Sequence, residues 1–328
     1  MDLSVIILNW NTRTLLEKCL ESLFNQPREF EVEIIVVDNA SEDGSREMVA
    51  DSFPQAQLVV NSTNIGFGAG NNAAVSRATG RYLLFLNTDT IVNEGALSRM
   101  VAFADCHPDI GILGPKLLNG DGSLQYSCRR YPNLAAGFFR NTPLGRLFPR
   151  NRFAGDYLMM DWDHASPRDV DWVSGAALMI RRRVVDEIGC FDEDFYMYCE
   201  DVDLCWRVNH TALPGVKDAE GIADPGTPRH WRVVYYPEAV IYHLIGKSSD
   251  QAPTRMTYEF HRSQYLFYKK HYAATMPLPL KPLILIGIAL RAVGQMTRFQ
   301  VRYWQRRILG LEGKKKTLPP AGKSGGST

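Results

Sequence analysis

Three carboxylates within four residues are the strongest chemical signal in this sequence. Glu200, Asp201 and Asp203 lie among aromatic residues in the segment 196–207, where an apolar segment meets a helical pattern. Ionising all three in a poorly solvated site is costly, so the pKa of at least one carboxylate is expected to rise. Such a group can accept a proton at neutral pH, as a general base does. The alternative is a solvated helix start, where acidic side chains interact favourably with the helix dipole.

Polar residues follow four of the predicted strands, at the carboxyl end of each. Strands are expected at residues 3–8, 32–37, 57–60, 82–86 and 110–113. Helices are expected between them at residues 13–25, 45–53, 68–78 and 93–106. This alternation predicts an α/β, Rossmann-like fold with a mostly parallel sheet between two layers of helices. Ligands bind at the carboxyl edge of such sheets, where the sequence places Asn9–Asn11, Asp38–Asn39, Asn61–Gly66 and Asn87–Asp89.

Composition and charge limit the classes of partner. The chain has 328 residues, 45% of them hydrophobic, and a formal net charge of +1, so no global field favours nucleic acid. Its six cysteines form no Cys-x-x-Cys pair, which favours reduced thiols over a disulfide framework or a zinc site. The N-terminus has no basic segment before its apolar run, which indicates a first strand rather than a signal peptide. These features predict a cytoplasmic protein.

The middle of the chain is less regular. A turn between short strands is expected at Asn119–Gly122, and a long loop at residues 131–165. One strand is expected over residues 170–180, with Ser174, Gly175 and Ala176 at its centre. After it we expect a helix at 183–188, the acidic segment, a loop at 213–229, strands at 232–236 and 239–243, and a helix at 255–272.

The C-terminal part combines apolar residues with a strong basic bias. Residues 280–316 contain nine Lys or Arg against one acid, Glu312. The apolar run at 283–290 is shorter than the roughly 20 residues that a membrane-spanning helix needs. Drawn as a helix, the segment has two stripes. The basic stripe contains Arg291, Gln295, Arg298, Arg302 and Arg306. The apolar stripe contains Leu285, Ile288, Ala292, Met296, Phe299 and Tyr303. This pattern predicts a helix lying in the interface of an anionic membrane, with a helix packed on the globule as the alternative.

Five motifs, in order along the chain, resemble those of the family 2 inverting glycosyltransferases, which have the GT-A fold. They are Val5–Asn11, Val36–Ser41, Asn64–Asn72, Leu86–Asp89 and Glu200–Arg207. The resemblance covers residues 3–245, and within the family the chain looks most like bacterial rhamnosyltransferases and related enzymes of cell-wall or O-antigen assembly. It implies transfer of a sugar, with rhamnose favoured, from a dTDP- or UDP-linked donor. The implied acceptor is a lipid-linked glycan at the inner face of the cell membrane.

The resemblance also implies roles for residues along the donor. Asp38 would accept a hydrogen bond from N3–H of the base, since an ionised carboxylate only accepts. Gly66 would let the backbone approach the nucleotide. A dinucleotide fingerprint is excluded, because Asn71 replaces the last glycine of the motif and the segment does not follow the first strand. The implied donor ligands are Asn9, Asp38, Asn64, Gly66, Phe67, Asn71, Asn87, Thr88 and Asp89.

The segment Asn87–Asp89 occupies the place of the family's Asp-x-Asp metal motif, with an amide instead of the first carboxylate. The resemblance implies Mg²⁺ or Mn²⁺ held by Asp89 and His243, with the donor diphosphate and water completing the shell. It implies Asp201 as the general base, with Glu200 as its rival. Residues implied to lie near the sugar or the acceptor are Trp172, Ser174, Gly175, Asp203 and Trp206.

The expected organisation is one GT-A domain followed by helices. Residues 1–115 would form its nucleotide-sugar-binding half and residues 116–250 its acceptor-binding and catalytic half. Helices with the membrane-associating segment would occupy 251–312, before a disordered tail at 313–328. Two other functions stay open: a sugar-nucleotide nucleotidyltransferase, which would want a Gly-rich basic loop after the first strand, and a catalytically silent, membrane-tethered sugar-nucleotide-binding protein. A homo-oligomer is also open.

Overall fold

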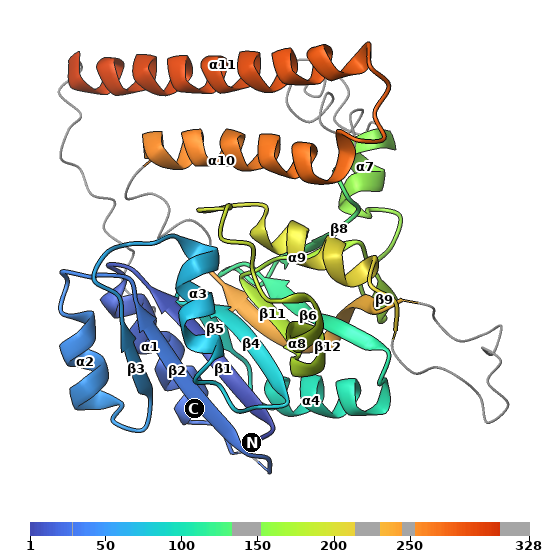
Figure 1. Ribbon diagram of the computed structural model, residues 1–328. Helices are drawn as coiled ribbons and strands as arrows, with labels where there is room; N and C mark the ends of the chain where they lie inside the picture. The colour runs from blue at the N-terminus through green and yellow to red at the C-terminus, as the bar shows by residue number, and fades with distance from the viewer. Residues whose placement is uncertain (28, 133–151, 214–229, 245–252, 309–328) are drawn as a thin grey trace, which may run out of the picture.

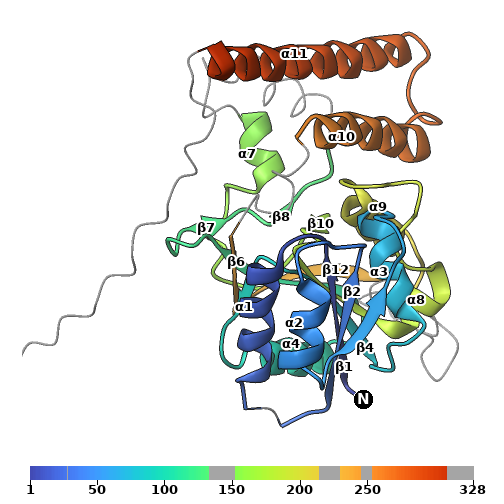
Figure 2. The same ribbon diagram turned by 90° about the vertical axis from the view of Figure 1, so that its left-hand side faces the viewer.

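The computed structural model describes residues 1–27, 29–132, 152–213, 230–244 and 253–308 (Figure 1). A ten-stranded sheet with helices on both faces forms the body of the molecule. Two long helices, α10 (Pro253–Phe267) and α11 (Leu280–Ile308), are stacked beyond it (Figures 1 and 2). The predicted loop after Leu213 and the predicted tail at 313–328 lie outside the described residues.

Four parallel strands form the N-terminal half of the sheet. In spatial order they are β3 (Gln57–Val60), β2 (Val32–Asp38), β1 (Leu3–Asn9) and β4 (Tyr82–Asn87). Their register sets Asn9 opposite Asp38 and Leu8 opposite Asn87. The carboxyl ends of β1, β2 and β4 therefore meet at one edge of the sheet, as the sequence pattern predicts.

Apolar residues at alternating positions of these strands build two separate cores. Leu3, Val5 and Ile7 belong to the core with α1 (Arg13–Phe24), α2 (Ser45–Ser52) and α4 (Ala96–Cys106). Ile6 belongs to the other core, with α3 (Phe67–Val75), α8 (Arg182–Ile188) and α9 (Glu200–Asn209). Each such side chain contributes about 1.5–3 kcal/mol when fully buried. Burial on both faces confirms the predicted fold class and explains why the strands are almost continuously apolar.

The second half of the sheet is mixed in direction. It contains β11 (Ala177–Arg181), β6 (Ile110–Leu118), β12 (Arg232–His243) and β5 (Thr90–Val92). Strand β11 runs antiparallel to β4 and β6, whereas β6 and β12 are parallel. The strands predicted at 232–236 and 239–243 are one strand, β12, with an irregular register between Tyr236 and Val240. Short strands β7 (Leu124–Gln125) and β9 (Arg168–Asp169) pair with β6 and β12.

The prediction of one strand over residues 170–180 is wrong. Strand β10 (Trp172–Val173) pairs with β8 (Cys128–Arg129), whereas β11 belongs to the main sheet. Between them the backbone N–H of Ser174 donates to Ser127 and that of Gly175 donates to Asp201, so the chain leaves the strand conformation there. The apolar residues on either side of the break hide it from a hydrophobicity pattern.

Two further predictions about local structure differ from what is observed. Helix α7 (Arg152–Leu158) lies within the predicted loop at 131–165, of which residues 133–151 are outside the described part. The helix predicted at 255–272 is present, but its last turn is a π-helix, η2 (Tyr268–Tyr272). This turn carries His271 to the acidic segment, where its Nε2 lies 2.7 Å from Oδ1 of Asp203.

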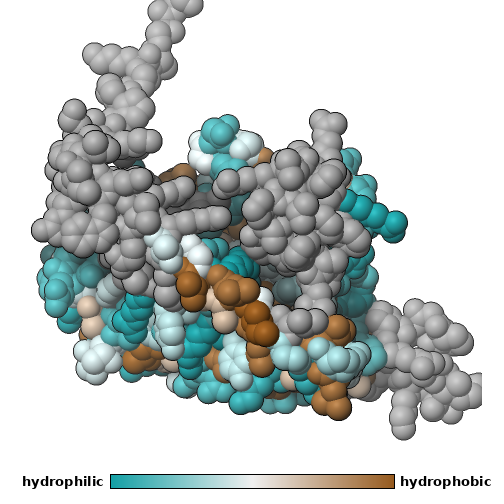
Figure 3. Space-filling view, turned by 90° about the horizontal axis from the view of Figure 1, so that it is seen from above, coloured by the Kyte–Doolittle hydropathy of each residue, from teal (hydrophilic) through white to brown (hydrophobic). Residues whose placement is uncertain are grey.

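Helix α11 presents a mainly apolar face away from the protein. Arg291 donates to Gln264 of α10 and Gln295 contacts His261, so these polar residues face inward. The basic and apolar stripes predicted from spacing are therefore not the inner and outer faces of the helix. The exposed side, which is turned toward the viewer in Figure 3, includes Leu285, Ile286, Leu290 and Val293. None of the described helices combines the length and apolar content needed to cross a membrane.

Candidate functional site

Asp38 is buried at the end of β2 with both carboxylate oxygens occupied. Its Oδ1 accepts from Nδ2 of Asn9 at 3.1 Å, and its Oδ2 accepts from the backbone N–H of Ser41 at 2.9 Å. Nε of Arg46 lies 3.2 Å from the same Oδ2. These contacts fix the carboxylate at the carboxyl edge, while Oδ1 keeps a further acceptor lone pair.

The turn after β3 is fastened to the beginning of the acidic segment. Tyr196 donates through its hydroxyl to Oδ1 of Asn64 at 3.0 Å, and its carbonyl accepts from the backbone N–H of Phe67 at 2.7 Å. Gly66 has a φ of +95°, and a Cβ there would lie 2.5 Å from the carbonyl oxygen of Tyr196. Any other residue would be strained by the positive φ and would collide with this carbonyl, so only glycine fits the turn.

The side chains of two further predicted donor ligands, Asn71 and Thr88, also have partners within the protein. Nδ2 of Asn71 donates to the carbonyl of Phe67 at 3.0 Å, one turn earlier in α3. The hydroxyl of Thr88 accepts from that of Thr12 at 2.9 Å. Asn87 donates through its backbone N–H to Ala176 at 3.0 Å, which ties the end of β4 to the break before β11. These three residues therefore shape the edge of the sheet.

Asp201 lies in the first turn of α9 and is held by two backbone donors. Gly175 donates to Oδ2 at 2.9 Å and Val202 donates to Oδ1 at 2.8 Å. A Cβ at Gly175 would lie 3.4 Å from Cβ of Asp201 and 3.5 Å from Cε1 of Phe67, so the three residues surround one small space. Burial raises the pKa of Asp201, while the two N–H donors and the charge of Arg129 oppose that rise.

Glu200 has a different environment from its neighbour. It is 5% exposed, and its Oε2 makes no hydrogen bond within the described part of the chain. Burial, together with the negative charge of Asp201, raises the pKa of Glu200 well above its usual range. The two carboxyls therefore differ in their hydrogen bonds. This difference favours a proton on Glu200 and an ionised Asp201 that can accept one.

Asp203 is buried and joins α9 to the C-terminal helices. Nε2 of His271 lies 2.7 Å from its Oδ1, and Nε of Arg207 lies 2.8 Å from its Oδ2. Burial raises the pKa of Asp203, but the hydrogen bonds from His271 and Arg207 outweigh burial and lower it overall. The contacts of Asp203 are those of a residue that positions α9.

Both tryptophans predicted near the sugar are packed into the protein. Trp206 stacks on His210 with ring centroids 4.2 Å apart. Trp172 is largely buried and donates from Nε1 to the carbonyl of Arg130 at 2.9 Å. Oγ of Ser174 accepts from the N–H of Ala176 at 3.3 Å and so supports the break after β10. Within this predicted group, Gly175 is the residue that hydrogen-bonds to Asp201 in the described structure.

Asp89 and His243 lie together, because β12 pairs with β5 directly after Asp89. Nε2 of His243 is 3.3 Å from Oδ1 of Asp89, and that buried Oδ1 makes no hydrogen bond to any described residue. The other ring nitrogen of His243, Nδ1, lies 2.7 Å from Oε1 of Gln125. The described residues contain no cluster of three or more His, Cys, Asp or Glu side chains suited to a metal.

Four residues of this region were not predicted as site residues from the sequence: Arg46, Gln125, Tyr196 and His271. Most of them reach the site through contacts distant in sequence, such as the 118 positions that separate Gln125 from His243. Tyr196 precedes the acidic segment, so proximity to that segment was the one available signal. The other three lie in segments whose packing a single sequence does not reveal.

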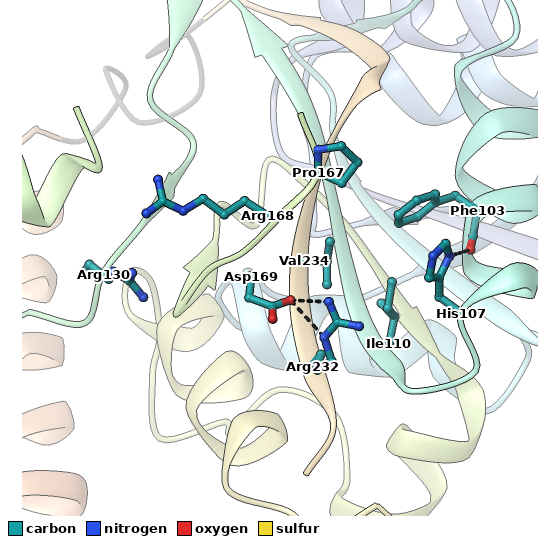
Figure 4. Close-up of a pocket in the computed structure, with 9 residues that line it drawn as sticks. All are labelled: Phe103, His107, Ile110, Arg130, Pro167, Arg168, Asp169, Arg232 and Val234. Atoms are coloured by element: carbon teal, nitrogen blue, oxygen red, sulfur yellow. Dashed lines mark hydrogen bonds and ion pairs between the residues drawn. The ribbon is translucent and has the colours of Figure 1, made fainter. Parts of the chain in front are cut away.

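A cavity of about 600 Å³ lies where β6 and β12 begin, away from the carboxyl edge (Figure 4). Arg232 lines it and is paired with Asp169 at 2.7 Å and with Asp109 at 2.7 Å. Arg130 and Arg168 also line it and have carboxylate partners. None of the predicted site residues is among its described lining. This cavity therefore lies apart from the residues predicted to carry the chemistry, and its arginines are already paired.

Comparison with known proteins identifies the family. The chain is 28% identical over 324 residues to the N-acetylglucosaminyl-diphospho-decaprenol L-rhamnosyltransferase of Mycobacterium tuberculosis, covering 95% of this chain and 98% of the relative. Its fold is similar to that of TarS from S. aureus (TM-score 0.53, 17% identity, 89% of this chain and 71% of the other). It is also similar to the mannosyltransferase PcManGT from Pyrobaculum calidifontis in complex with GDP-Man and Mn²⁺ (TM-score 0.50, 18% identity, 95% and 76%). The family model for glycosyl transferase family 2 matches residues 4–188, more than half of the chain, and this protein therefore belongs to that family.

Proposed function

We propose that this glycosyltransferase moves a sugar, with L-rhamnose favoured, from a dTDP-linked donor to a lipid-linked glycan, with inversion at the anomeric carbon. The observation that carries the proposal is the carboxylate of Asp201, held by Gly175 beside Phe67. The choice of sugar and acceptor is supported by the similarity, over almost the full length of both chains, to the mycobacterial L-rhamnosyltransferase. UDP-linked donors are the second choice.

Asp201 is the general base of this proposal. Its two backbone donors stabilise the ionised form, so the carboxylate can take the proton of the acceptor hydroxyl. The acceptor oxygen then attacks the anomeric carbon from the face opposite the departing diphosphate, which inverts its configuration. General-base assistance of this kind contributes about 10²–10⁴ in rate.

Glu200 keeps its proton while Asp201 is ionised. Its Oε2 lacks a hydrogen-bond donor among the described residues, and a second negative charge beside Asp201 would be costly. The backbone N–H donors of Gly175 and Val202 favour the negative charge on Asp201 instead. We therefore assign the proton transfer to Asp201 and a supporting role to Glu200.

Asp89 and His243 fit a divalent metal. Their facing atoms, Oδ1 and Nε2, are 3.3 Å apart, close to the roughly 3 Å between adjacent ligands of an octahedral shell. A carboxylate with an imidazole suits Mn²⁺, or Mg²⁺ with more water, and the buried Oδ1 of Asp89, which accepts no hydrogen bond from the described residues, supports this assignment. A metal bound there would neutralise charge on the leaving diphosphate. Because Asn87 replaces the first carboxylate of the metal motif, Asp89 and His243 are the two protein ligands proposed for the metal.

The two halves of the domain divide the substrates between them. Residues 1–115 would bind the nucleoside diphosphate, with Asp38 toward the base and the turn at Gly66 along the donor. Residues 116–250 would supply the general base and receive the acceptor. The hydrogen bond from Phe67 to Tyr196 crosses between the halves, and Phe67 also lies beside Gly175 and Asp201, which supports a reaction centre at their junction.

The C-terminal helices would hold the enzyme at the inner face of the cell membrane. Helix α11 contains six Lys or Arg and no acidic residue, which suits an anionic surface. Its exposed side carries Leu285, Ile286, Leu290 and Val293, which suit the boundary between headgroups and acyl chains. Because α10 packs on the acidic segment and α11 packs on α10, this arrangement would bring the site close to a lipid-linked acceptor (Figure 1).

The proposal is tested by supplying purified full-length protein with dTDP-L-rhamnose and a polyprenyl-diphosphate-linked N-acetylglucosamine, with Mn²⁺ or with EDTA. We expect a disaccharide-lipid product whose new glycosidic bond has the anomeric configuration opposite to that of the donor. UDP- and GDP-sugars serve as matched donors. Transfer with retained configuration would exclude the mechanism, and transfer from a different donor alone would replace rhamnose in the proposal.

A further inference from the structure

The side-chain amide of Gln125 contacts both the ring and the backbone of His243. Gln125 ends β7, which pairs with β6, and β6 in turn pairs with β12. Its Nε2 lies 3.3 Å from the carbonyl oxygen of His243 and 3.0 Å from Oδ1 of Asn119. Its Oε1 lies 2.7 Å from Nδ1 of the imidazole. One amide thus meets three groups, and its orientation decides which ring nitrogen carries the proton.

The backbone carbonyl fixes the orientation of this amide. A carbonyl oxygen only accepts hydrogen bonds, so the amide nitrogen of Gln125 must be the atom that faces the carbonyl of His243. The amide oxygen then faces Nδ1, and because that oxygen also only accepts, Nδ1 must carry a proton. In the neutral imidazole, the form that can bind a metal, the lone pair is then on Nε2, which faces Oδ1 of Asp89 at 3.3 Å.

We propose that Gln125 is a positioning residue, which holds His243 in the tautomer whose Nε2 binds the divalent metal. This inference rests on the metal site proposed at Asp89 and His243. Metal-ligating histidines usually donate their second N–H to an acceptor, and loss of that acceptor typically lowers metal affinity about 10–100-fold. Gln125 supplies this acceptor and acts through His243 rather than on the substrate.

The turn before β7 holds Gln125 in place. Asn119 accepts from Gln125 through Oδ1 and donates through Nδ2 to Oγ of Ser123 at 2.9 Å. The backbone N–H of Asn119 donates to the carbonyl of Ser123 at 2.8 Å, and Asp121 accepts from the N–H of Ser123 at 3.0 Å. The turn predicted at Asn119–Gly122 thereby supports a metal ligand that lies on another strand.

The Mn²⁺ affinity of the full-length protein saturated with dTDP tests the inference, with free Mn²⁺ followed by electron paramagnetic resonance. Gln125→Met keeps the length of the side chain and removes the acceptor, so we expect Mn²⁺ to bind about 10–100-fold more weakly. Gln125→Glu keeps an acceptor oxygen for Nδ1 but loses the donor to the carbonyl of His243, so it should recover part of the affinity. Gln57→Met is the matched control, because Gln57 is exposed on β3 and should leave Mn²⁺ affinity unchanged.

Three results would contradict the inference, and they are distinguishable. Equal Mn²⁺ affinity in Gln125→Met and wild type would overturn the role of Gln125 and leave the metal site intact. No Mn²⁺ binding by wild type would overturn the proposed metal site and the inference with it. If Gln125→Met does not fold, as judged by thermal melting, Asn119→Ala takes its place, since it keeps Gln125 and removes the side-chain hydrogen bonds of Asn119 to the amide and to Ser123. Unchanged Mn²⁺ affinity in Asn119→Ala would then contradict the inference.

Discussion

Oδ2 of Asp201 accepts a hydrogen bond from the backbone N–H of Gly175 at 2.9 Å, which joins the first turn of α9 to the break between β10 and β11. The second carboxylate oxygen accepts from Val202 at 2.8 Å, so the carboxylate has a fixed orientation. Burial raises the pKa of Asp201, and these N–H donors work against burial by stabilising the ionised form. A break in a strand and the beginning of a helix thus create the environment of the proposed base.

Removing the carboxylate of Asp201 should abolish most turnover. We expect Asp201→Asn to lower kcat by about 10²–10⁴, because the amide cannot take the acceptor proton. Donor binding should be kept, since the proposed donor contacts lie on other segments. The measurement is kcat with saturating donor, together with donor affinity by calorimetry.

Glu200→Gln is the matched comparison for Asp201→Asn. If Glu200 is protonated in the active enzyme, the amide resembles its working state, and kcat should fall less than in Asp201→Asn. A larger loss in Glu200→Gln than in Asp201→Asn would reverse the two assignments. Near-wild-type turnover in both variants would place the base elsewhere.

Glu200 should also make stability depend on pH. Its folded pKa is raised by burial and by the charge of Asp201, so its contribution is fully present below the unfolded value of about 4.3 and is lost as pH rises through the folded pKa. Glu200→Gln cannot ionise, so we expect it to melt at a higher temperature than wild type at alkaline pH. The difference should shrink below pH of about 4. Melting curves across pH measure it, and a difference independent of pH would mean that the folded pKa is not raised.

A methyl group at Gly175 should block the site without unfolding the protein. Its Cβ would lie 3.4 Å from Cβ of Asp201, which is ordinary contact, but it would occupy the space between Asp201 and Phe67. We expect Gly175→Ala to fold and to lose at least about tenfold in kcat/KM, a transition-state loss of about 1.4 kcal/mol.

Gly66→Ala should differ from Gly175→Ala in its effect on stability. Its Cβ would lie 2.5 Å from a carbonyl oxygen at a φ of +95°, so this variant should lose stability as well as activity. Thermal melting and kcat/KM separate the two effects. Full activity in Gly175→Ala would show that the space beside Asp201 is not used by substrate.

The sequence pattern predicts the parallel half of the sheet well, because strands such as β1 are buried on both faces and are apolar throughout. It fails at Ser174–Ala176, where a break of three residues is decided by hydrogen bonds to Ser127 and Asp201 rather than by hydrophobicity. Polar edge residues such as Asp38 and Asp89 could be placed because parallel strands end at one edge. Gln125 and His271 could not, since their roles depend on the pairing of β7 with β6 and on a π-helical turn.

Asp203 should matter more for stability than for proton transfer. Asp203→Asn removes the charge that pairs with His271 and Arg207, and breaking a buried pair costs about 3–5 kcal/mol. The folded pKa of Asp203 is lowered, so its contribution is present above the unfolded value of about 3.9 and is lost as pH falls through the folded pKa. Urea unfolding at neutral pH measures the cost.

Asp194→Asn is the control for this variant. Asp194 is exposed and pairs with Lys270 at 2.9 Å, and loss of an exposed pair should cost less than about 1 kcal/mol. Equal costs for the buried and the exposed aspartate would contradict the structural role of Asp203. So would a fall in kcat for Asp203→Asn with unchanged stability, which would instead place Asp203 in the chemistry.

The exposed side of α11 should control association with membranes. Leu290 on this side is 67% exposed, and burying a leucine in an apolar environment is worth about 1.5–3 kcal/mol. We expect Leu290→Glu to weaken binding to anionic vesicles by about tenfold or more, with activity on a short-chain acceptor kept. Val60→Glu, at an exposed apolar position on β3, should bind vesicles as wild type does.

Vesicle co-sedimentation at low and high salt measures the effect of Leu290→Glu. Light scattering after size exclusion tests the competing explanation, in which this side of α11 is a subunit interface. If wild type ignores vesicles and Leu290→Glu converts a dimer to a monomer, this side of α11 is a subunit interface and the membrane proposal is wrong.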